Sequence, residues 1–174
     1  VMHKGKLVFE FFNNFTTCET PHIIFSISKS LTSLLTGILV SKKLIDVNTS
    51  VTKILPETIG SAYEDATIRN VLDMNVASNF IEDYSGKAEI FQKYRSSTGW
   101  DIPSNNDMTH LSGLHEFLSN LPKSMYLHGK KYHYCSPHSD LLGWIIERVS
   151  EEKYSKIISD LLFKPSGIMN DANV

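Results

Sequence analysis

The chain has 174 residues, of which 41% are hydrophobic and 21% charged, and its formal net charge is −2 at pH 7. This length suits one domain with its own hydrophobic core. A charge so close to zero provides neither the basic surface expected of a nucleic-acid-binding protein nor an acidic tail. The two cysteines, Cys18 and Cys135, are too few and too far apart for a disulfide framework, which leaves the redox compartment open.

The sequence contains no stretch that is apolar enough to predict a membrane span. The best candidate, residues 23–40, is interrupted by a lysine and several serines and threonines. No secretory signal peptide is recognisable near the start, although the first residue, Val1, is compatible with prior processing. Composition therefore constrains the localisation only weakly.

Residues 1–12, VMHKGKLVFEFF, predict two short strands joined by a turn at Lys4-Gly5. A two-stranded hairpin is marginally stable alone, so this one is expected to join a larger sheet. Residues 27–43 predict a helix whose leucines and isoleucines are accompanied by small residues on the other faces, which indicates close packing all round. Two shorter helices are predicted over residues 50–56, with Ser50 as N-cap, and over residues 67–74.

From residue 75 to residue 109 the composition changes to Asn, Asp, Ser, Gly and Pro with scattered aromatic residues, which predicts a long irregular segment. A helix over residues 87–94 interrupts it. Long irregular segments within compact domains are often functional. Further helices are predicted over residues 112–121, 138–149 and 152–163. The helices outnumber the strands, and the hairpin has no predicted partner strand.

The segment 24-IFSISKSLTSLLTGILV-40 places a lysine near the start of a helix that is otherwise expected to be buried. Ser26 and Lys29 are three residues apart, so their side chains share a helix face. A serine hydroxyl becomes an effective nucleophile when a base takes its proton, and a neutral lysine amine can be that base. Apolar surroundings and the positive end of a helix dipole both favour the neutral amine. The backbone N–H of Ser26 would also lie where a helix N-terminus can hold an oxyanion.

The same serine-to-lysine spacing occurs at two other places, where a structural explanation is sufficient. Ser50 precedes Lys53, but this serine is expected to cap a helix and the lysine to be solvated. Ser150 and Lys153 lie in a charged run that is typical of an exposed surface. Spacing alone therefore leaves a structural role open for the first pair as well.

A second motif lies about a hundred residues downstream, in 132-YHYCSPHSDLLGWIIERVS-150. A Tyr-x-Ser triplet followed by a helix of this type, after S-x-x-K, resembles the serine hydrolases related to class C β-lactamases. Within that group the chain is most similar to the 6-aminohexanoate-dimer hydrolase branch, which shares the Tyr-Cys-Ser triplet. The stretches FSISKSLTSLL, LIDVNTSVTKILPE, ATIRNVLDM and FKPSGI extend the resemblance over nearly the whole chain.

The resemblance implies a role for each matching residue. Ser26 corresponds to the nucleophile that accepts the acyl group, and Lys29 to its base. Tyr134 corresponds to the phenol or phenolate that passes a proton to the leaving group. Three further positions correspond to substrate-binding residues of the resembling branch: Tyr84, Trp100 and Ser136, the last of which stands where many relatives have asparagine. For Tyr84 and Trp100 a core or surface role is the alternative.

The resemblance also implies the fold, which is α+β and β-lactamase/transpeptidase-like. The chain would be a partial domain, with residues 1–22 as the hairpin of the α/β part, residues 23–150 as the catalytic helix and helical region, and residues 151–174 returning toward the sheet. The third motif of the family and the C-terminal sheet strands are expected to be missing. The unpaired edge of the hairpin would then be a template for a homo-oligomer.

The implied reaction is hydrolysis of a small-molecule amide or ester through an acyl-enzyme, with no metal or organic cofactor. The resembling branch is cytoplasmic, while many relatives are exported, so a cytoplasmic location is a weak expectation that does not exclude the periplasm. A non-catalytic relative that binds a ligand or peptide is the main alternative, and a structural role is another. A metal site is less favoured, because the spacing of His128, His133, Cys135 and His138 matches no common zinc pattern.

Overall fold

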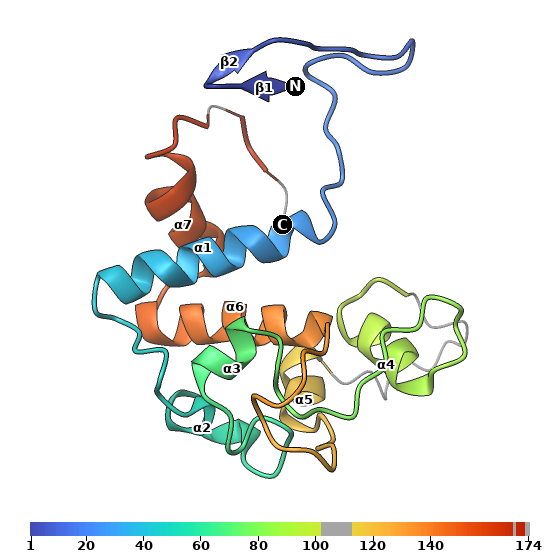
Figure 1. Ribbon diagram of the computed structural model, residues 1–174, viewed down its shortest axis with the longest axis vertical. Coiled ribbons are helices and arrows are strands. Elements are labelled where there is room, and N and C mark those ends of the chain that lie inside the picture. Colours follow the sequence, from blue (N-terminus) through green and yellow to red (C-terminus); the bar gives the residue numbers. More distant parts are fainter. Residues whose placement is uncertain (102–112, 169, 173–174) are drawn as a thin grey trace.

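A computed structural model describes residues 1–101, 113–168 and 170–172 of the chain. Two long helices, α1 (Ile27–Ser41) and α6 (Ser136–Ser150), lie side by side at its centre (Figure 1) and pack against each other. Shorter elements surround this pair: α2 (Val51–Ile54), the 3₁₀ turn η1 (Pro56–Thr58), α3 (Ile68–Leu72), α4 (Glu89–Ser97), α5 (Leu114–Ser119), α7 (Tyr154–Ile158) and the π-helical turn η3 (Ser159–Phe163).

The N-terminal hairpin forms as predicted but is short. Strand β1 (Met2–His3) pairs antiparallel with β2 (Lys6–Leu7), and Met2 lies opposite Leu7. The turn residues Lys4 and Gly5 have φ values of 47° and 74°, as a two-residue hairpin turn with primed geometry requires. The hairpin stands away from the helices (Figure 1), so its edge is exposed, and self-association through that edge remains a prediction.

The core lies between α1 and α6 and the short helices below them. Leu35 and Leu39 of α1 are fully buried, as are Leu141 and Ile145 of α6. Apolar side chains spaced three or four residues apart produce these buried stripes, because such residues share a helix face. The elements at either end of the long helices complete the core with Val51, Leu55, Tyr63, Ile68, Val71, Phe80 and Leu118.

The prediction that α1 is packed all round is wrong. Its buried residues lie on one face, whereas Ile27 is 63% exposed and Leu34 is 53% exposed on the other. In the described part of the chain α1 packs against α6 and η3, and the face that carries Ile27 and Leu34 stays exposed. The small residues of α1 allow close packing but do not by themselves determine which faces are covered.

Aromatic side chains hold α4 and α5 against the irregular segment that follows α3. Phe80 makes edge-to-face contacts with Phe91 and Tyr94 of α4 and with Phe117 of α5, at centroid distances of 6.2, 5.6 and 6.3 Å. Edge-to-face pairs of this kind add to the stabilisation from area burial. The cluster fixes the segment around residues 80–86 next to the start of α6.

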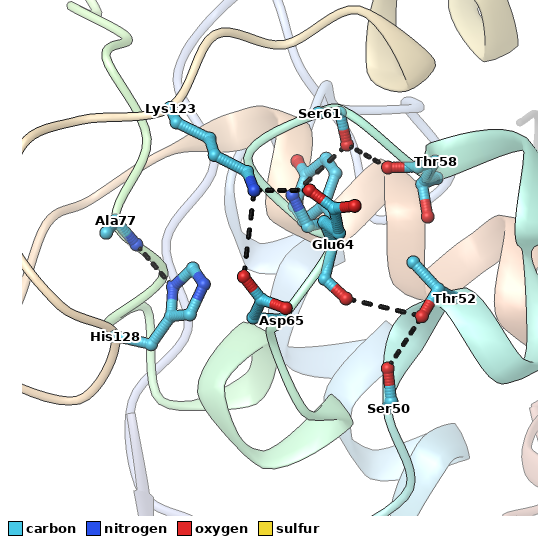
Figure 2. A network of polar contacts seen from close by, with 10 residues as sticks. Ser50, Thr52, Thr58, Ser61, Glu64, Asp65, Ala77, Lys123 and His128 are labelled. Carbon is cyan, nitrogen blue, oxygen red and sulfur yellow. Dashed lines mark hydrogen bonds and ion pairs between the residues drawn. The ribbon is translucent and has the colours of Figure 1, made fainter.

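Polar contacts stabilise the connections at the other side of the domain (Figure 2). Lys123 pairs with Glu64 and lies 3.6 Å from the carboxylate of Asp65, so the chain after α5 is joined to the loop before α3. His128 accepts a hydrogen bond from the backbone N–H of Ala77 at 2.9 Å. Thr52 in the same view links Ser50 to a backbone carbonyl of that loop.

The predicted helices all correspond to observed ones, with different ends. Ser50 occupies the N-cap position of α2 but its side chain makes no capping hydrogen bond, whereas Thr67 forms a full capping box at α3. The expected start of α5, Ser112, lies outside the described residues, as do residues 102–109 of the irregular segment. Within the described ranges, none of the helices is both long and apolar enough to cross a lipid bilayer.

Candidate active site

Ser26 lies at the N-terminus of α1, and the residue before it has a backbone conformation that is unusual for a large side chain. Phe25 has a φ of 42°, in the left-handed region that is rare for bulky residues. Its carbonyl oxygen accepts hydrogen bonds from the backbone N–H of Ser28 at 3.1 Å and from the Ser28 hydroxyl at 2.6 Å. Backbone conformations of this kind persist where surrounding bonds hold them, and they are frequent at functional sites.

The Ser26 hydroxyl is the meeting point of three predicted catalytic side chains. Lys29, one turn along α1, donates from Nζ to Ser26 Oγ at 3.0 Å. Tyr134, which precedes α6, donates from its hydroxyl to the same oxygen at 2.7 Å. The Lys29 amine also lies 5.5 Å from the centre of the Tyr134 ring. The α1–α6 packing therefore brings together residues that are 108 positions apart in the chain.

Lys29 is half-buried, and Ser26 is exposed. Among the residues that the structure describes, Lys29 forms no ion pair with a carboxylate, and its amine donates a hydrogen bond to the Ser26 hydroxyl. The Ser26 backbone N–H makes no hydrogen bond within the described ranges and lies at the N-terminus of a fifteen-residue helix. This end of α1 is thus suited to hold a negatively charged oxygen.

A cavity of about 380 Å³ opens beside Ser26 and Lys29. Its walls come from the start of α1, the segment after Phe80, α4 with the turn that follows it, and the start of α6. Five of the twelve lining residues are aromatic, and charged groups lie among the rings. The lining residues besides Ser26 and Lys29 are Phe25, Ser28, Glu82, Tyr84, Phe91, Tyr94, Arg95, Trp100, Ser136 and Asp140.

Glu82 was not predicted, yet it is the centre of the hydrogen bonding in the cavity wall. Its carboxylate accepts hydrogen bonds from the backbone N–H of Ser136 at 3.0 Å and from the Ser136 hydroxyl at 2.9 Å. It also accepts one from the Tyr84 hydroxyl. This bond to the carboxylate raises the pKa of Tyr84 to about 12. Because Ser136 is the first residue of α6, Glu82 supplies a cap to that helix from a distant segment.

The three predicted substrate-binding residues all line the same cavity, but they differ in how exposed their side chains are. Tyr84 is 74% exposed and Trp100 is 63% exposed, and both rings line the cavity. Ser136 is buried, and its hydroxyl is occupied by Glu82. The core alternative for Tyr84 and Trp100 is therefore wrong, since neither ring is buried.

A second carboxylate, Asp140, also faces the cavity from α6. The Tyr94 hydroxyl donates to Asp140 Oδ2 at 2.6 Å. Burial raises the pKa of Asp140 above its usual value, and the positive charge of Lys29 acts in the opposite direction. Tyr94 thereby connects the aromatic cluster of α4 to the wall of the site.

The four residues weighed as metal ligands have separate partners. His128 bonds to Ala77, as described above, and His133 Nε2 lies 2.7 Å from the carbonyl oxygen of Phe80. Cys135 is buried, and burial raises its pKa, whereas the other cysteine, Cys18, is exposed. The ring of His138 is buried in the core, and its Nδ1 lies 3.1 Å from the Tyr63 hydroxyl. The Ser78 hydroxyl lies 3.9 Å from Cys135 Sγ, so each of the four has a partner of its own within the fold.

Comparison with known proteins identifies the family. The family model named Beta-lactamase matches residues 1–172. The chain belongs to the beta-lactamase family. A relative within this group, the 6-aminohexanoate-dimer hydrolase of Paenarthrobacter ureafaciens, is 29% identical over 174 residues, which is 100% of this chain and 43% of that protein.

Solved structures of the same group share the fold. A Bacillus anthracis protein provisionally named as a 6-aminohexanoate-dimer hydrolase matches with a TM-score of 0.74 and 18% identity, over 88% of this chain and 40% of that one. A D-stereospecific amidohydrolase from Streptomyces sp. matches with a TM-score of 0.62 and 19% identity, over 83% and 42%. The predicted β-lactamase/transpeptidase-like fold is confirmed, and the chain spans less than half the length of these relatives.

Proposed function

We propose that the chain carries the catalytic serine of a hydrolase that acts on small amides or esters through an acyl-enzyme at Ser26. The observation that supports this most directly is the convergence of the Lys29 amine and the Tyr134 hydroxyl on Ser26 Oγ, at 3.0 and 2.7 Å. A nucleophile with its base within hydrogen-bonding distance is the general signature of covalent catalysis. The hydrolase relatives support the same reaction class.

Each group has a defined part in the acylation step. Lys29 takes the proton of Ser26 as Oγ forms a bond to the substrate carbonyl carbon, and the carbonyl oxygen becomes an oxyanion. Tyr134 passes a proton to the departing amine or alcohol as the bond between carbonyl carbon and leaving group breaks. Water then attacks the acyl-enzyme through the reverse proton transfers, which releases the acid and restores Ser26.

Among the residues that the structure describes, we assign one donor to the oxyanion, the backbone N–H of Ser26. Its position at the N-terminus of α1 adds the positive end of the helix dipole. A second donor typically contributes about a hundred- to a thousand-fold in rate. Acylation of Ser26 is therefore a more sensitive test of this proposal than turnover.

The test is covalent labelling of the folded 174-residue chain with a fluorophosphonate activity probe, followed by intact mass and peptide mapping. We expect one adduct, on Ser26, that is absent in Ser26→Ala. In Lys29→Ala the labelling rate should fall by about 10²- to 10⁴-fold, because the general base is lost. Lys53→Ala is the matched control, since Lys53 has the same spacing from Ser50 and should change nothing.

The outcomes separate the candidate functions. Labelling at Ser26 that depends on Lys29 supports the hydrolase. If circular dichroism shows that the chain is folded and the chain takes no label, the hydrolase proposal is contradicted. That result favours the alternative that the protein binds its ligand without acyl transfer. Labelling that is equal in the wild type and in Lys29→Ala contradicts the assigned base.

A further inference from the structure

Phe25 directs its ring into the cavity from the position next to the nucleophile. The side chain is 66% exposed although it is large and apolar, and it lines the cavity beside Ser26. The two hydrogen bonds from Ser28 hold its carbonyl and so maintain the left-handed backbone. A conformation that is unfavourable for a phenylalanine is thus kept at the one residue that precedes Ser26, and it leaves the ring outside the core.

Trp100 lies opposite Phe25 and is held in place by the end of α4. The backbone N–H of Trp100 donates to the carbonyl of Arg95 at 3.0 Å, and the side chains of Arg95 and Asp101 form an ion pair at 2.6 Å. Backbone and side-chain contacts on both sides of Trp100 therefore fix the turn that carries its ring. An indole held by its neighbours loses little freedom when a ligand binds to it.

The two rings form a pair that is open to solvent at the mouth of the site. Their centroids are 6.4 Å apart and their planes differ by 20°. Both are mostly exposed, which is unusual for two large apolar side chains in contact, and such exposure commonly marks a binding surface. The other aromatic residues of the wall are Tyr84, Phe91 and Tyr94. Tyr84 meets Phe91 edge to face at 5.0 Å, and Phe91 stacks on Tyr94 at 6.2 Å, but Phe91 is buried and Tyr94 is half-buried, so their faces are less open to solvent than those of Phe25 and Trp100.

Building on the proposed function, we infer that Phe25 is a specificity-determining residue, which together with Trp100 binds a flat aromatic group attached to the reacting carbon of the substrate. The position of Phe25 next to Ser26 places its ring beside whatever is bonded to that carbon. Flat rings stack on aromatic faces, whereas a methyl group covers little of such a face. The preferred substrates are therefore arylacetyl-type or benzoyl-type amides and esters, in preference to acetyl ones.

The experiment compares two sulfonyl fluorides, phenylmethanesulfonyl fluoride and methanesulfonyl fluoride, which share a leaving group and differ by one phenyl ring. In both reactions Ser26 Oγ bonds to sulfur, the sulfur–fluorine bond breaks, fluoride leaves and the serine proton passes to Lys29. Rates of adduct formation are measured by intact mass and divided by the rate of hydrolysis of each reagent in buffer. We expect the phenyl reagent to be favoured about tenfold, the factor that corresponds to about 1.4 kcal/mol of stacking.

Variants of Phe25 decide whether its ring is responsible. Phe25→Ala should reduce the rate ratio to about one, and Phe25→Tyr should keep it because the flat face is retained. Phe15→Ala is the control, since Phe15 is 93% exposed and does not line the cavity. Circular dichroism checks the fold of each variant.

Four results would overturn the inference. An unchanged rate ratio in Phe25→Ala would show that the ring does not select the substrate. A parallel fall of both rates would assign Phe25 a role in placing Ser26 instead. A chain that reacts with the fluorophosphonate but equally with both sulfonyl fluorides would refute the aromatic preference and leave the hydrolase proposal standing, whereas failure of the fluorophosphonate would refute both.

Discussion

Glu82 joins the irregular segment beside the cavity to the first residue of α6. In Glu82→Ala, the Ser136 backbone N–H, the Ser136 hydroxyl and the Tyr84 hydroxyl lose their common acceptor. We expect the free energy of unfolding to fall by about 2 kcal/mol, because donors left without a partner in a partly buried site cost about 1–3 kcal/mol. Urea denaturation followed by circular dichroism measures the change.

An exposed glutamate provides the comparison for this effect. Glu89 of α4 pairs with Lys93 at 2.7 Å on the solvent side of the helix. Glu89→Ala should unfold at the same urea concentration as the wild type, because exposed ion pairs contribute little. If Glu82→Ala also matched the wild type, its hydrogen bonds would have no net stabilising effect.

The sequence predicted the contacts of Lys29 and Tyr134 with Ser26 better than the wall of the cavity around them. Ser26 and Lys29 share a helix face, so their contact follows from local spacing, and the Tyr-x-Ser motif added Tyr134. Glu82 meets Ser136 across 54 positions, with no local spacing that relates them. Its only signal was its place in the same IEDYSG stretch as Tyr84.

At the scale of the elements, α1 has one face in the core and another in solvent. Leu35 is fully buried, while its neighbour Leu34 is 53% exposed. Leu35→Ala should lower the free energy of unfolding by about 3 kcal/mol, through lost burial and the cavity that remains. Leu34→Ala should change it by less than about 0.5 kcal/mol, as is usual for exposed sites. Similar losses in the two variants, measured by urea denaturation, would contradict the one-sided packing of α1.

The elements could be located from the sequence because their apolar spacing and end signals are local. Thr67 begins α3 through a capping box, and the positive-φ turn at Lys4-Gly5 allows the hairpin. The start of α6 at Ser136 was predicted two residues late, since its cap comes from a distant carboxylate and not from a neighbouring serine or aspartate. Which faces of α1 are buried depends on which other elements pack against it. The composition of the helix alone does not show which elements these are.

At the scale of the whole molecule, stability toward acid depends on His138. This residue is fully buried in the core, and burial lowers its pKa from 6.5 to about 3. Between these values the unfolded chain binds a proton that the folded chain does not, so the folded state loses stability as the pH falls. The contribution approaches about 1.4 kcal/mol per pH unit well below pH 6.5.

Thermal melts between pH 7 and pH 4 test this pH dependence. His138→Gln is expected to be less stable than the wild type at pH 7, because the contact with Tyr63 changes, but to lose less stability as the pH falls. His22→Gln, at an exposed position, should follow the wild type throughout. If the melts of His138→Gln and the wild type shift equally with pH, another group controls the acid response.

Because the two cysteines differ in exposure, the number of reactive thiols per chain measures the fraction of molecules that are folded. Cys18 is exposed and Cys135 is buried, so a disulfide exchange reagent should titrate one thiol in the native chain and both in denaturant. The stoichiometry requires no catalytic turnover and no spectroscopic reference. It therefore separates an inert but native preparation from a misfolded one in the same tube as the labelling reaction.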